Sequence, residues 1–350
     1  MKAGVGIDER LGLSLDQQRT LVQEAARLGY TSLWTPASAT GRSAFFTCGQ
    51  WWQATTAVVP EGLSVGISVV PFPAWSVPTL AAEAATLNAF SGGKHILGIG
   101  LGGYPSEAFR QPLGLDLVPP LRLTREYLGA TRDLLHGQKV TLDGQAVRLH
   151  GLQLGLAAPP TPVYLAAMGP QILRLAGAQA DGVTPNWSSP EQIVWLREQV
   201  AEGARQAGRE PGSVPFAQYI RVCIDDDADA ARRAFVANML GYAMARPGQP
   251  TDRGYRAHFG RMGFEEVLGD LEARRQAGAK MDELVDRVPP ELALRVGYFG
   301  TPDGAAAALR ELSRGLDEAM VRLISVRRGD LDGCLAAIGA CQPSGWLLSD

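Results

Sequence analysis

The clearest candidate for binding chemistry is a junction that runs from an apolar segment straight into a helical one. Residues 162–177 read PVYLAAMGPQILRLAG, and the turn Ala167-Met168-Gly169-Pro170 carries no charge. The first turn of a helix has free backbone amides and a partial positive charge, so it can bind a phosphate. Gly169 would let that phosphate approach the backbone closely. The alternative is a tight turn that needs Gly and Pro for its geometry alone.

A second candidate is the glycine-rich string LGIGLGG at residues 97–103. Gly98, Gly100 and Gly103 follow an apolar run and match G-x-G-x-x-G, the pattern of a dinucleotide-binding turn. That fingerprint also needs a long helix at once and an acidic residue after the next strand. Here prolines interrupt the following segment, and Asp116 lies too early. We therefore interpret the glycines as clearing space for a flat ring or its chain.

Four further residues have a functional and a structural interpretation. Asp8 follows an apolar segment, where its carboxylate either faces a binding site or simply ends the strand. Trp34 either belongs to the core or lies on the substrate side of a site. Arg42, on a Gly-containing loop, is either solvated or pairs with an acidic group of a substrate or cofactor. Ser68, inside the apolar run GISVVP, either bonds a neighbouring backbone group or marks a bulge beside a site.

The sequence lacks the common patterns of hydrolases and metalloenzymes. Its four histidines form no HExxH pair, and it contains no GxSxG nucleophile elbow. His95 lies in an apolar run, as a buried core histidine does. The four cysteines show no CxxC spacing, which favours a reduced, cytoplasmic protein without a metal site.

The candidate residues depend on apolar strands that alternate with amphipathic helices. Most of the apolar runs are continuous, which is typical of strands buried on both faces of a parallel sheet. Ser14 and Gln17 have the spacing of a helix capping box. The predicted strands are Ala3–Ile7, Ser32–Thr35, Leu63–Pro71, His95–Leu101, Pro162–Ala166, Gly182–Pro185, Pro215–Val222 and Met320–Val326, and the predicted helices after the first are Pro78–Phe90, Leu121–His136, Pro170–Ala178 and Pro190–Ala207.

Eight strands separated by helices predict an α/β fold of the (β/α)8 TIM-barrel class rather than an open sheet. The 350 residues exceed the roughly 250 of a typical barrel, so insertions are needed. One is a small hairpin at Gln138–Leu152 with Asp143-Gly144 at its turn. The other is a helical insertion at about 226–294, expected to cover the barrel mouth. No clean linker is present, so we predict a single domain over residues 1–350.

Composition narrows the partners to small molecules. A hydrophobic content of 46% and a net charge of −3 are typical of an ordinary globular protein. Lys and Arg are scattered along the chain, which argues against a nucleic-acid partner. No run of about 18 apolar residues predicts a membrane span, and the N-terminus lacks the apolar core of a signal peptide.

Four strings together resemble the bacterial luciferase-like superfamily. They are SGGKHILGIG at residues 91–100, YLAAMG at 164–169, ADGV at 180–183 and GTPD at 300–303. They occur in that family in this order and at about these spacings. The chain is most similar to the branch that includes methylenetetrahydromethanopterin reductase and other users of the deazaflavin coenzyme F420. Other branches use FMN.

The resemblance implies a barrel whose carboxyl-terminal mouth holds a flavin-like ring. In the deazaflavin branch, a bulge in the third strand contains a non-prolyl cis peptide that backs the ring. The backbone after the fifth strand holds the phosphate, and the turn after the fourth strand lines the cofactor chain. The implied cofactor-binding residues are Ser68 and Val69 in the bulge, Gly100, Leu101 and Gly102 after strand four, and Ala167, Met168 and Gly169 after strand five.

One departure from the family changes the expected mechanism. Several family dehydrogenases carry an Asp-His pair after the second strand, and the histidine serves as acid or base. This chain has Thr35-Pro36-Ala37 there. A reductase that depends on hydride transfer from the ring is therefore favoured. Asp8, or a water held near Thr35, could supply a proton.

The resulting prediction is an oxidoreductase that transfers a hydride between coenzyme F420 and an unknown organic substrate. The first alternative is an FMN-dependent luciferase-like monooxygenase, which would need a separate flavin reductase and oxygen. The second is a non-catalytic flavin-binding protein that has lost its acid–base residues. A NAD-dependent dehydrogenase is a further alternative, and only the glycine string supports it. Homo-oligomers are common in the family.

Overall fold

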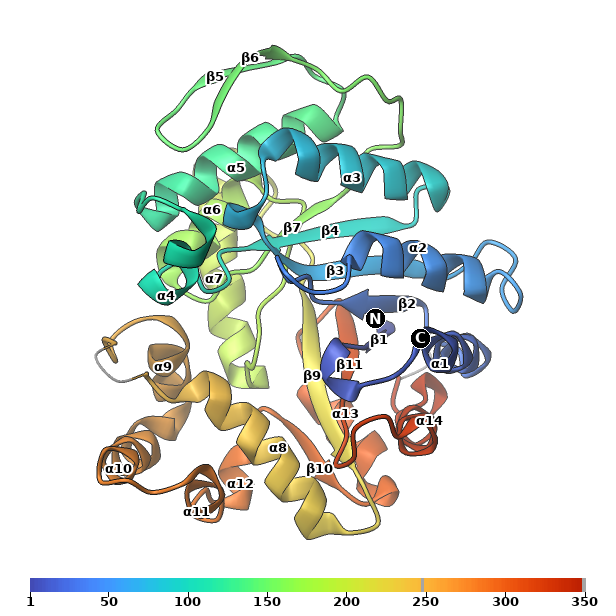
Figure 1. Cartoon of the computed structure of the whole chain (residues 1–350), viewed down its shortest axis with the longest axis vertical. Coiled ribbons are helices and arrows are strands. Elements are labelled where there is room, and N and C mark those ends of the chain that lie inside the picture. Colours follow the sequence, from blue (N-terminus) through green and yellow to red (C-terminus); the bar gives the residue numbers. More distant parts are fainter. Residues whose placement is uncertain (247–248, 348–350) are drawn as a thin grey trace. The chain divides into compact units, whose positions relative to one another are not determined.

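The computed structural model describes residues 1–246 and 249–347, which form two compact units (Figure 1). The first unit contains Met1–Tyr30, Pro185–Arg197 and the chain from Gln218 onward. The second contains Thr31–Thr184 and Glu198–Ala217. The single-domain assignment stays a prediction.

The second unit is built on parallel strands that follow one another in sequence order. Its strand order is β2-β3-β4-β7-β8, with bounds Ser32–Thr35, Ser64–Pro71, His95–Gly100, Val163–Leu165 and Gly182–Val183. Its main helices are α2 (Ala44–Thr55), α3 (Val77–Phe90), α5 (Pro120–Leu135) and α6 (Pro170–Gln179), and α7 (Pro190–Gln206) ends in it. Short segments α4 (Glu107–Arg110) and two 3-10 turns complete it. The strands are mostly buried, as their continuous apolar sequences predict.

The core of the second unit accommodates two aromatic rings where strands carry glycine. A Cβ atom on Gly66 of β3 would overlap the buried ring of Trp34. A Cβ atom on Gly182 of β8 would overlap the ring of Tyr164. The two ring centroids are 6.5 Å apart. Large and small residues thus interdigitate on neighbouring strands, as a well-packed core requires.

The predicted hairpin insertion belongs to the second unit and is confirmed. Strands β5 (Val140–Asp143) and β6 (Arg148–Leu152) pair antiparallel. The turn runs from Gly144 to Val147, slightly later than Asp143-Gly144. The carboxylate of Glu126 in α5 accepts backbone hydrogen bonds from Gln145, Ala146 and Val147 at 3.2, 2.7 and 3.0 Å. These bonds fix the hairpin to α5.

The first unit has strand order β10-β9-β11-β1. The bounds are Gly297–Gly300, Ala217–Ile224, Glu318–Ile324 and Lys2–Gly6. Residues of β1 pair in parallel with β11, and those of β10 pair in parallel with β9. Three helices are α1 (Leu15–Arg27), α13 (Ala305–Leu312) and α14 (Leu331–Ala340). The predicted capping box is confirmed, because the Ser14 hydroxyl accepts from the Gln17 amide while the Gln17 side chain accepts from the Ser14 amide.

The predicted helical insertion also lies in the first unit, and its helical character is confirmed. It comprises α8 (Ala228–Ala243), α9 (Gly254–Phe259), α10 (Glu265–Gln276), α11 (Met281–Val285) and α12 (Pro290–Ala293), with a π-helical segment, Gly260–Phe264, before α10. Residues 247–248 lie outside the described part. Phe235 of α8 and Phe259 of α9 pack on Trp187 in one apolar core. The insertion is therefore anchored to its unit by burial.

One strand was not predicted from the sequence. Strand β10 is only four residues long, GYFG, and begins and ends with glycine. Glycine weakens the strand signal because it adds backbone entropy and no packing side chain. The other strand bounds agree with the predicted ones to within three residues at each end.

Two further findings concern membranes and cysteines. Within the described ranges, no helix is both long and apolar enough to span a bilayer. The four cysteines are all buried and form no disulfide.

Helix α6 is fixed by a close crossing with α7. A Cβ atom on Gly203 of α7 would collide with the Arg174 carbonyl of α6, and one on Gly177 would collide with the Val200 carbonyl. Both contacts are to backbone, which cannot rotate out of the way. The absence of side chains at these two positions sets the distance between the helices.

We expect Gly203→Ala to lower the free energy of unfolding by about 2 kcal/mol, because the methyl group forces the helices apart. Gly129→Ala in α5 is the matched control, since no described atom lies within 4 Å of a Cβ there. The control should raise stability by about 0.5–1 kcal/mol through helix propensity alone. Urea denaturation of both variants measures the difference. Equal stability of the two variants would contradict the backbone contact.

Candidate functional site

The third strand is bulged at the position that the family resemblance implies. The Ser68–Val69 peptide is cis, and the pairing of β3 with β4 shifts register between Ile67 and Val70. The Ser68 hydroxyl lies 2.8 Å from the hydroxyl of Thr184, just after β8. The Val69 carbonyl accepts a hydrogen bond from the Ala37 amide at 3.2 Å. The predicted bulge and cis peptide are confirmed, while their contact with a cofactor stays a prediction.

Packing within the fold explains two glycines of the glycine-rich string. A Cβ on Gly98 would collide with the Ile67 carbonyl oxygen. A Cβ on Gly100 would lie 2.8 Å from Val69 Cγ2 and 2.9 Å from Ala166 Cβ. These glycines therefore let the β3 bulge pack against β4. The interpretation that they clear space for a ring is not needed to explain Gly98 and Gly100.

The turn after the glycine string is also constrained. Gly102 is exposed and has a φ of 56°, in the left-handed region that favours glycine. Leu101 beside it is half-buried. Both residues immediately follow the carboxyl end of β4, where binding loops of barrels are found.

The junction at Gly169 differs from the glycine string, because nothing in the described fold requires a glycine there. Gly169 is the N-cap of α6, with φ −96° and ψ 154°, values that any residue can adopt. Within the described ranges, no atom lies within 4 Å of a Cβ built at this position. Half-buried Met168 and buried Ala167 precede it. Gly169 thus leaves open space beside the first turn of the helix.

The start of α6 also lacks a side-chain cap from the described residues. By contrast, the serine hydroxyls at positions 43 and 76 accept hydrogen bonds from the first turns of α2 and α3. The Ala166 amide donates to the Ile99 carbonyl at 2.8 Å, which aligns the junction with β4. Open space and an uncapped first turn are the features that a bound phosphate needs.

The three candidates in and after β2, namely Trp34, Thr35 and Arg42, differ in environment. Trp34 is fully buried, and its indole N–H donates to the Ser32 hydroxyl at 2.9 Å. This burial favours the core interpretation of Trp34, whose ring lies beside Gly66, while its substrate-side role stays a prediction. Thr35 is buried and donates its hydroxyl to the Pro36 carbonyl at 3.3 Å. Arg42 lies on an exposed bend, as predicted.

Asp8 belongs to the first unit and is held as an anion. It accepts a hydrogen bond from the Arg10 amide at 2.7 Å and forms an ion pair with Arg322 of β11. The side chains of Asp8 and Arg322 are 9% and 6% exposed. Burial alone would raise the pKa of Asp8, but the charges and hydrogen bonds of Arg322 and Arg10 outweigh it and lower the pKa. The expected role of Asp8 as a proton donor is therefore disfavoured at neutral pH.

A cluster of polar and aromatic residues in the first unit was missed by sequence reasoning. Arg221 of β9 is buried, its guanidinium donates to the Asn186 side chain at 2.7 Å, and it lies 4.0 Å from the centre of the Trp187 ring. It also lies 5.2 Å from the centre of the Tyr242 ring. We call Asn186, Trp187, Arg221 and Tyr242 the Arg221 cluster. The available signal was an arginine inside the apolar strand sequence AQYIRVCI.

The cluster adjoins the Asp8–Arg322 pair through shared neighbours. Tyr219, two residues before Arg221 on the same face of β9, has its ring 4.5 Å from the Arg322 guanidinium. Arg10 donates to the Tyr242 hydroxyl at 3.1 Å. Gly6 makes room for this arrangement, since a Cβ there would lie 2.6 Å from the Tyr219 ring.

The arginines change the acidity of the cluster. Burial would raise the pKa of Tyr242, but Arg221, Arg322 and Arg10 lower it to about 8. Burial lowers the pKa of Arg221 to about 10, and the neighbouring charge of Arg322 acts in the same direction. Tyr242 is therefore mostly protonated at pH 7 but can lose its proton under mild alkaline conditions.

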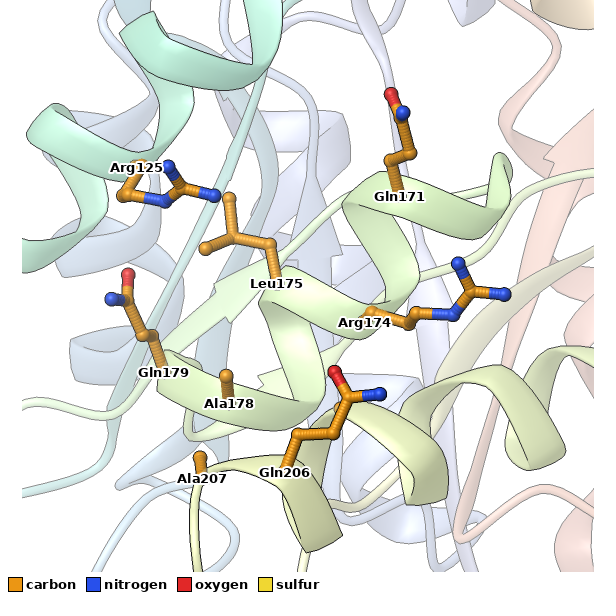
Figure 2. Close-up of a pocket in the computed structure, with 9 residues that line it drawn as sticks. Arg125, Gln171, Arg174, Leu175, Ala178, Gln179, Gln206 and Ala207 are labelled. Carbon is orange, nitrogen blue, oxygen red and sulfur yellow. The ribbon is translucent and has the colours of Figure 1, made fainter.

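A surface hollow of about 240 Å³ lies elsewhere in the second unit (Figure 2). Side chains from α5, α6 and the end of α7 surround it, among them Arg125, Leu175 and Gln206. It opens along the side of α6 and includes none of the predicted cofactor residues. Its lining begins at Gln171, in the first turn of α6, and does not include Ala167, Met168 or Gly169.

Comparison with known proteins confirms the predicted class of fold. The chain is similar to the solved coenzyme F420-dependent tetrahydromethanopterin reductase of Methanopyrus kandleri, with a TM-score of 0.73, 21% identity and 98% of both chains covered. It is also similar to an oxygenating constituent of 3,6-diketocamphane monooxygenase of Pseudomonas putida in complex with FMN. That likeness has a TM-score of 0.65 and 17% identity over 100% of this chain and 99% of the other. The chain thus has the (β/α)8 barrel fold with helical and hairpin insertions.

The sequence assigns the family. Residues 2–318 match the model of the luciferase-like monooxygenases, and the chain belongs to this family of oxidoreductase enzymes. It is 30% identical over 301 residues to a 5,10-methylenetetrahydromethanopterin reductase of Methanolobus tindarius, which covers 86% of this chain and 87% of the relative. The predicted resemblance is confirmed.

We expect Asp8→Asn to lower the free energy of unfolding by about 3 kcal/mol at pH 7, because it leaves the buried Arg322 charge unpaired. The Asp8 pKa is depressed, so its contribution is present above the unfolded pKa, near 4, and is lost as the pH falls through the folded pKa. The difference between wild type and variant should therefore shrink below about pH 4. Chemical denaturation across this range measures it.

Asp143→Asn is the control for this prediction. Asp143 pairs with Arg148 at 3.6 Å on the surface, and both side chains are more than two-thirds exposed. Its replacement should change stability by about 0.5 kcal/mol or less at every pH. An Asp8→Asn variant as stable as this control would contradict the buried ion pair.

Proposed function

We propose that this protein is a coenzyme F420-dependent oxidoreductase that transfers a hydride between the deazaflavin and an organic substrate. The single observation that carries the proposal is the uncapped first turn of α6, beside Gly169, where the fold leaves open space. The likeness to a methylenetetrahydromethanopterin reductase and to an F420-dependent reductase supports the choice of cofactor.

The proposed cofactor residues fall on three loops of the second unit. The backbone of Ala167, Met168 and Gly169 would hold the phosphate at the positive end of α6. The bulge at Ser68 and Val69 would support one face of the ring, with the Ser68 hydroxyl held by Thr184. The turn at Gly100, Leu101 and Gly102 would line the cofactor chain. The deazaflavin, when bound, supplies the hydride chemistry, and the protein supplies position and environment.

Proton handling in this proposal differs from that of family dehydrogenases with a histidine after the second strand. Thr35 occupies this region, and its buried hydroxyl could position a water. The lowered pKa of Asp8 makes it an electrostatic partner of Arg322 rather than an acid. Arg42, on its exposed bend, remains a candidate for contact with the substrate. Three further points stay predictions: that the helical insertion sets substrate specificity, that the protein forms homo-oligomers, and that it is cytoplasmic.

The principal alternative is an FMN-dependent monooxygenase, supported by the likeness to a monooxygenase structure with FMN. Such an enzyme would consume oxygen and depend on a flavin reductase. A non-catalytic flavin-binding protein is the second alternative, because the family histidine is replaced at Thr35-Pro36-Ala37. Cofactor preference separates the first alternative from the proposal, and turnover separates the second.

We expect Gly169→Leu to weaken F420 binding at least tenfold, about 1.4 kcal/mol, because its side chain would occupy the space beside the first turn of α6. Folding should be unaffected, since the backbone conformation suits any residue and no described atom lies near the new Cβ. Gly212→Leu, at an exposed turn with equally open surroundings, is the control and should bind as wild type does. Isothermal titration of each protein with F420, and separately with FMN, gives the dissociation constants.

The outcomes separate the hypotheses. Micromolar or tighter binding of F420 but not FMN supports the proposed function. Preference for FMN favours the monooxygenase and makes oxygen consumption the next assay. An unchanged F420 dissociation constant in folded Gly169→Leu would overturn the phosphate assignment.

A further inference from the structure

Arg221 is a buried cation without a carboxylate partner among the described residues. The residue is 1% exposed. Its guanidinium contacts the Asn186 amide oxygen, the rings of Trp187 and Tyr219, and Tyr242 through both its ring and a hydrogen bond. None of these groups is a carboxylate, and the Tyr242 phenol, with a pKa of about 8, is mostly protonated at pH 7. Burying a charge without a counter-charge is costly, so such an arrangement needs a reason.

Another buried arginine of the same unit shows the usual solution. Arg256 of α9 has a side chain that is 4% exposed, and it pairs with two carboxylates. Its guanidinium lies 2.7 Å from Glu265 and 3.1 Å from Glu272. Arg256 is thus a neutralised structural residue, whereas Arg221 has ring contacts and hydrogen bonds to the Asn186 amide and to Tyr242, with no carboxylate among the described residues.

The charges around Arg221 add to a positive surplus. Arg10 and Arg322 share the single carboxylate of Asp8, and Arg221 adds a third cation. Three guanidinium groups and one carboxylate leave two positive charges at pH 7. The remaining titratable neighbours are the phenols of Tyr219, Tyr242 and Tyr255, and burial raises the pKa of Tyr255 above its ordinary value. Tyr242, with a pKa of about 8, and Tyr255, with a raised pKa, do not supply a full negative charge at pH 7.

The cluster is held rigidly. The side-chain oxygen of Asn186 accepts a hydrogen bond from the Arg221 guanidinium. Its side-chain nitrogen donates to the Tyr255 hydroxyl at 2.6 Å. Trp187 is fully buried and has a φ of 55°, uncommon for a large side chain. Its ring is in contact with Phe235, Tyr242 and Phe259. The guanidinium is therefore pre-oriented, which is what specific recognition requires.

We propose that Arg221 and Tyr242, supported by Arg322, bind an oxyanion, a carboxylate or a phosphate, carried by the substrate. The assignment of the anion to a substrate rests on the proposed function, but anion binding itself is tested without turnover. A carboxylate or phosphate would accept hydrogen bonds from the guanidinium and from the Tyr242 hydroxyl and would offset the surplus charge. Tyr242 is half-buried and Arg10 is exposed, so these two side chains offer a route for the anion to Arg221.

The test uses acetate and inorganic phosphate as probes, with chloride at equal ionic strength as the reference. The ionisation of Tyr242 is followed as the ultraviolet absorbance of wild type minus that of Tyr242→Phe across pH 6–11. We expect a midpoint near pH 8 in chloride. A bound oxyanion should move this midpoint upward by about one unit, because it offsets the arginine charges that favour the phenolate.

Affinity is measured in parallel by calorimetric titration. Arg221→Gln keeps a polar partner for Asn186 and should weaken probe binding at least tenfold. Arg261→Gln, which removes another arginine over an indole ring of the same unit, is the matched control and should bind the probe as wild type does. If Arg221→Gln does not fold, Tyr242→Phe replaces it, with an expected loss of several-fold.

Each outcome bears on the inference. Preference for acetate assigns a carboxylate, and preference for phosphate assigns a phosphate. Failure of both probes to bind or to move the Tyr242 midpoint overturns the inference, as does equal binding by Arg221→Gln. The wild-type protein is also titrated with F420, and binding of an oxyanion without F420 would overturn the proposed function while leaving the oxyanion site in place.

Discussion

The bulge of β3 packs closely against β4 because β4 has glycine at positions 98 and 100. The carbonyl of Ile67 and the side chain of Val69 occupy the places that Cβ atoms of Gly98 and Gly100 would take. This close approach gives the shift in register between β3 and β4. It also lets the Ser68 hydroxyl reach Thr184, so that the bulge is tied to the end of β8. The candidate cofactor loops of the second unit are therefore arranged around one backbone-to-backbone contact.

A similar contact fixes the helix that carries the phosphate-binding candidate. Gly177 and Gly203 bring the backbones of α6 and α7 together, and the junction before α6 is bonded to β4 through the Ala166 amide. The direction and the start of α6 are thus determined by packing and by strand pairing. Gly169 takes no part in either, which explains why it can face a ligand.

Much of the fold was predictable from the sequence because it follows from local patterns. Buried parallel strands have continuous apolar sequences, and the capping box at Ser14 marks a helix start directly. Strand β10 could not be found in this way, because its four residues, GYFG, give a weak strand signal and its pairing with β9 appears only in the tertiary structure. The Arg221 cluster depends on residues 186, 187, 221 and 242, which only the tertiary structure brings together. For Trp34 both interpretations were open, and its burial together with the close approach of Gly66, which the sequence does not show, favours the core.

The sequence strings shared with the family contain residues of two kinds, those that the fold requires and those that it does not. In ADGV, the Asp181 carboxylate accepts from Arg132 at 3.1 and 2.6 Å and from the Val163 amide at 2.9 Å, so it fixes the start of β7. In the glycine string, Gly98 and Gly100 accommodate the bulge. These positions are explained by the fold itself and would be needed with any ligand. Gly169 in YLAAMG has no such internal reason, and a side chain there would cost the fold nothing that the structure shows. Gly129 and Gly212 have equally open surroundings, so an unrequired glycine alone does not indicate a bound molecule. The phosphate assignment rests on the combination, at Gly169, of open space with the uncapped first turn of α6.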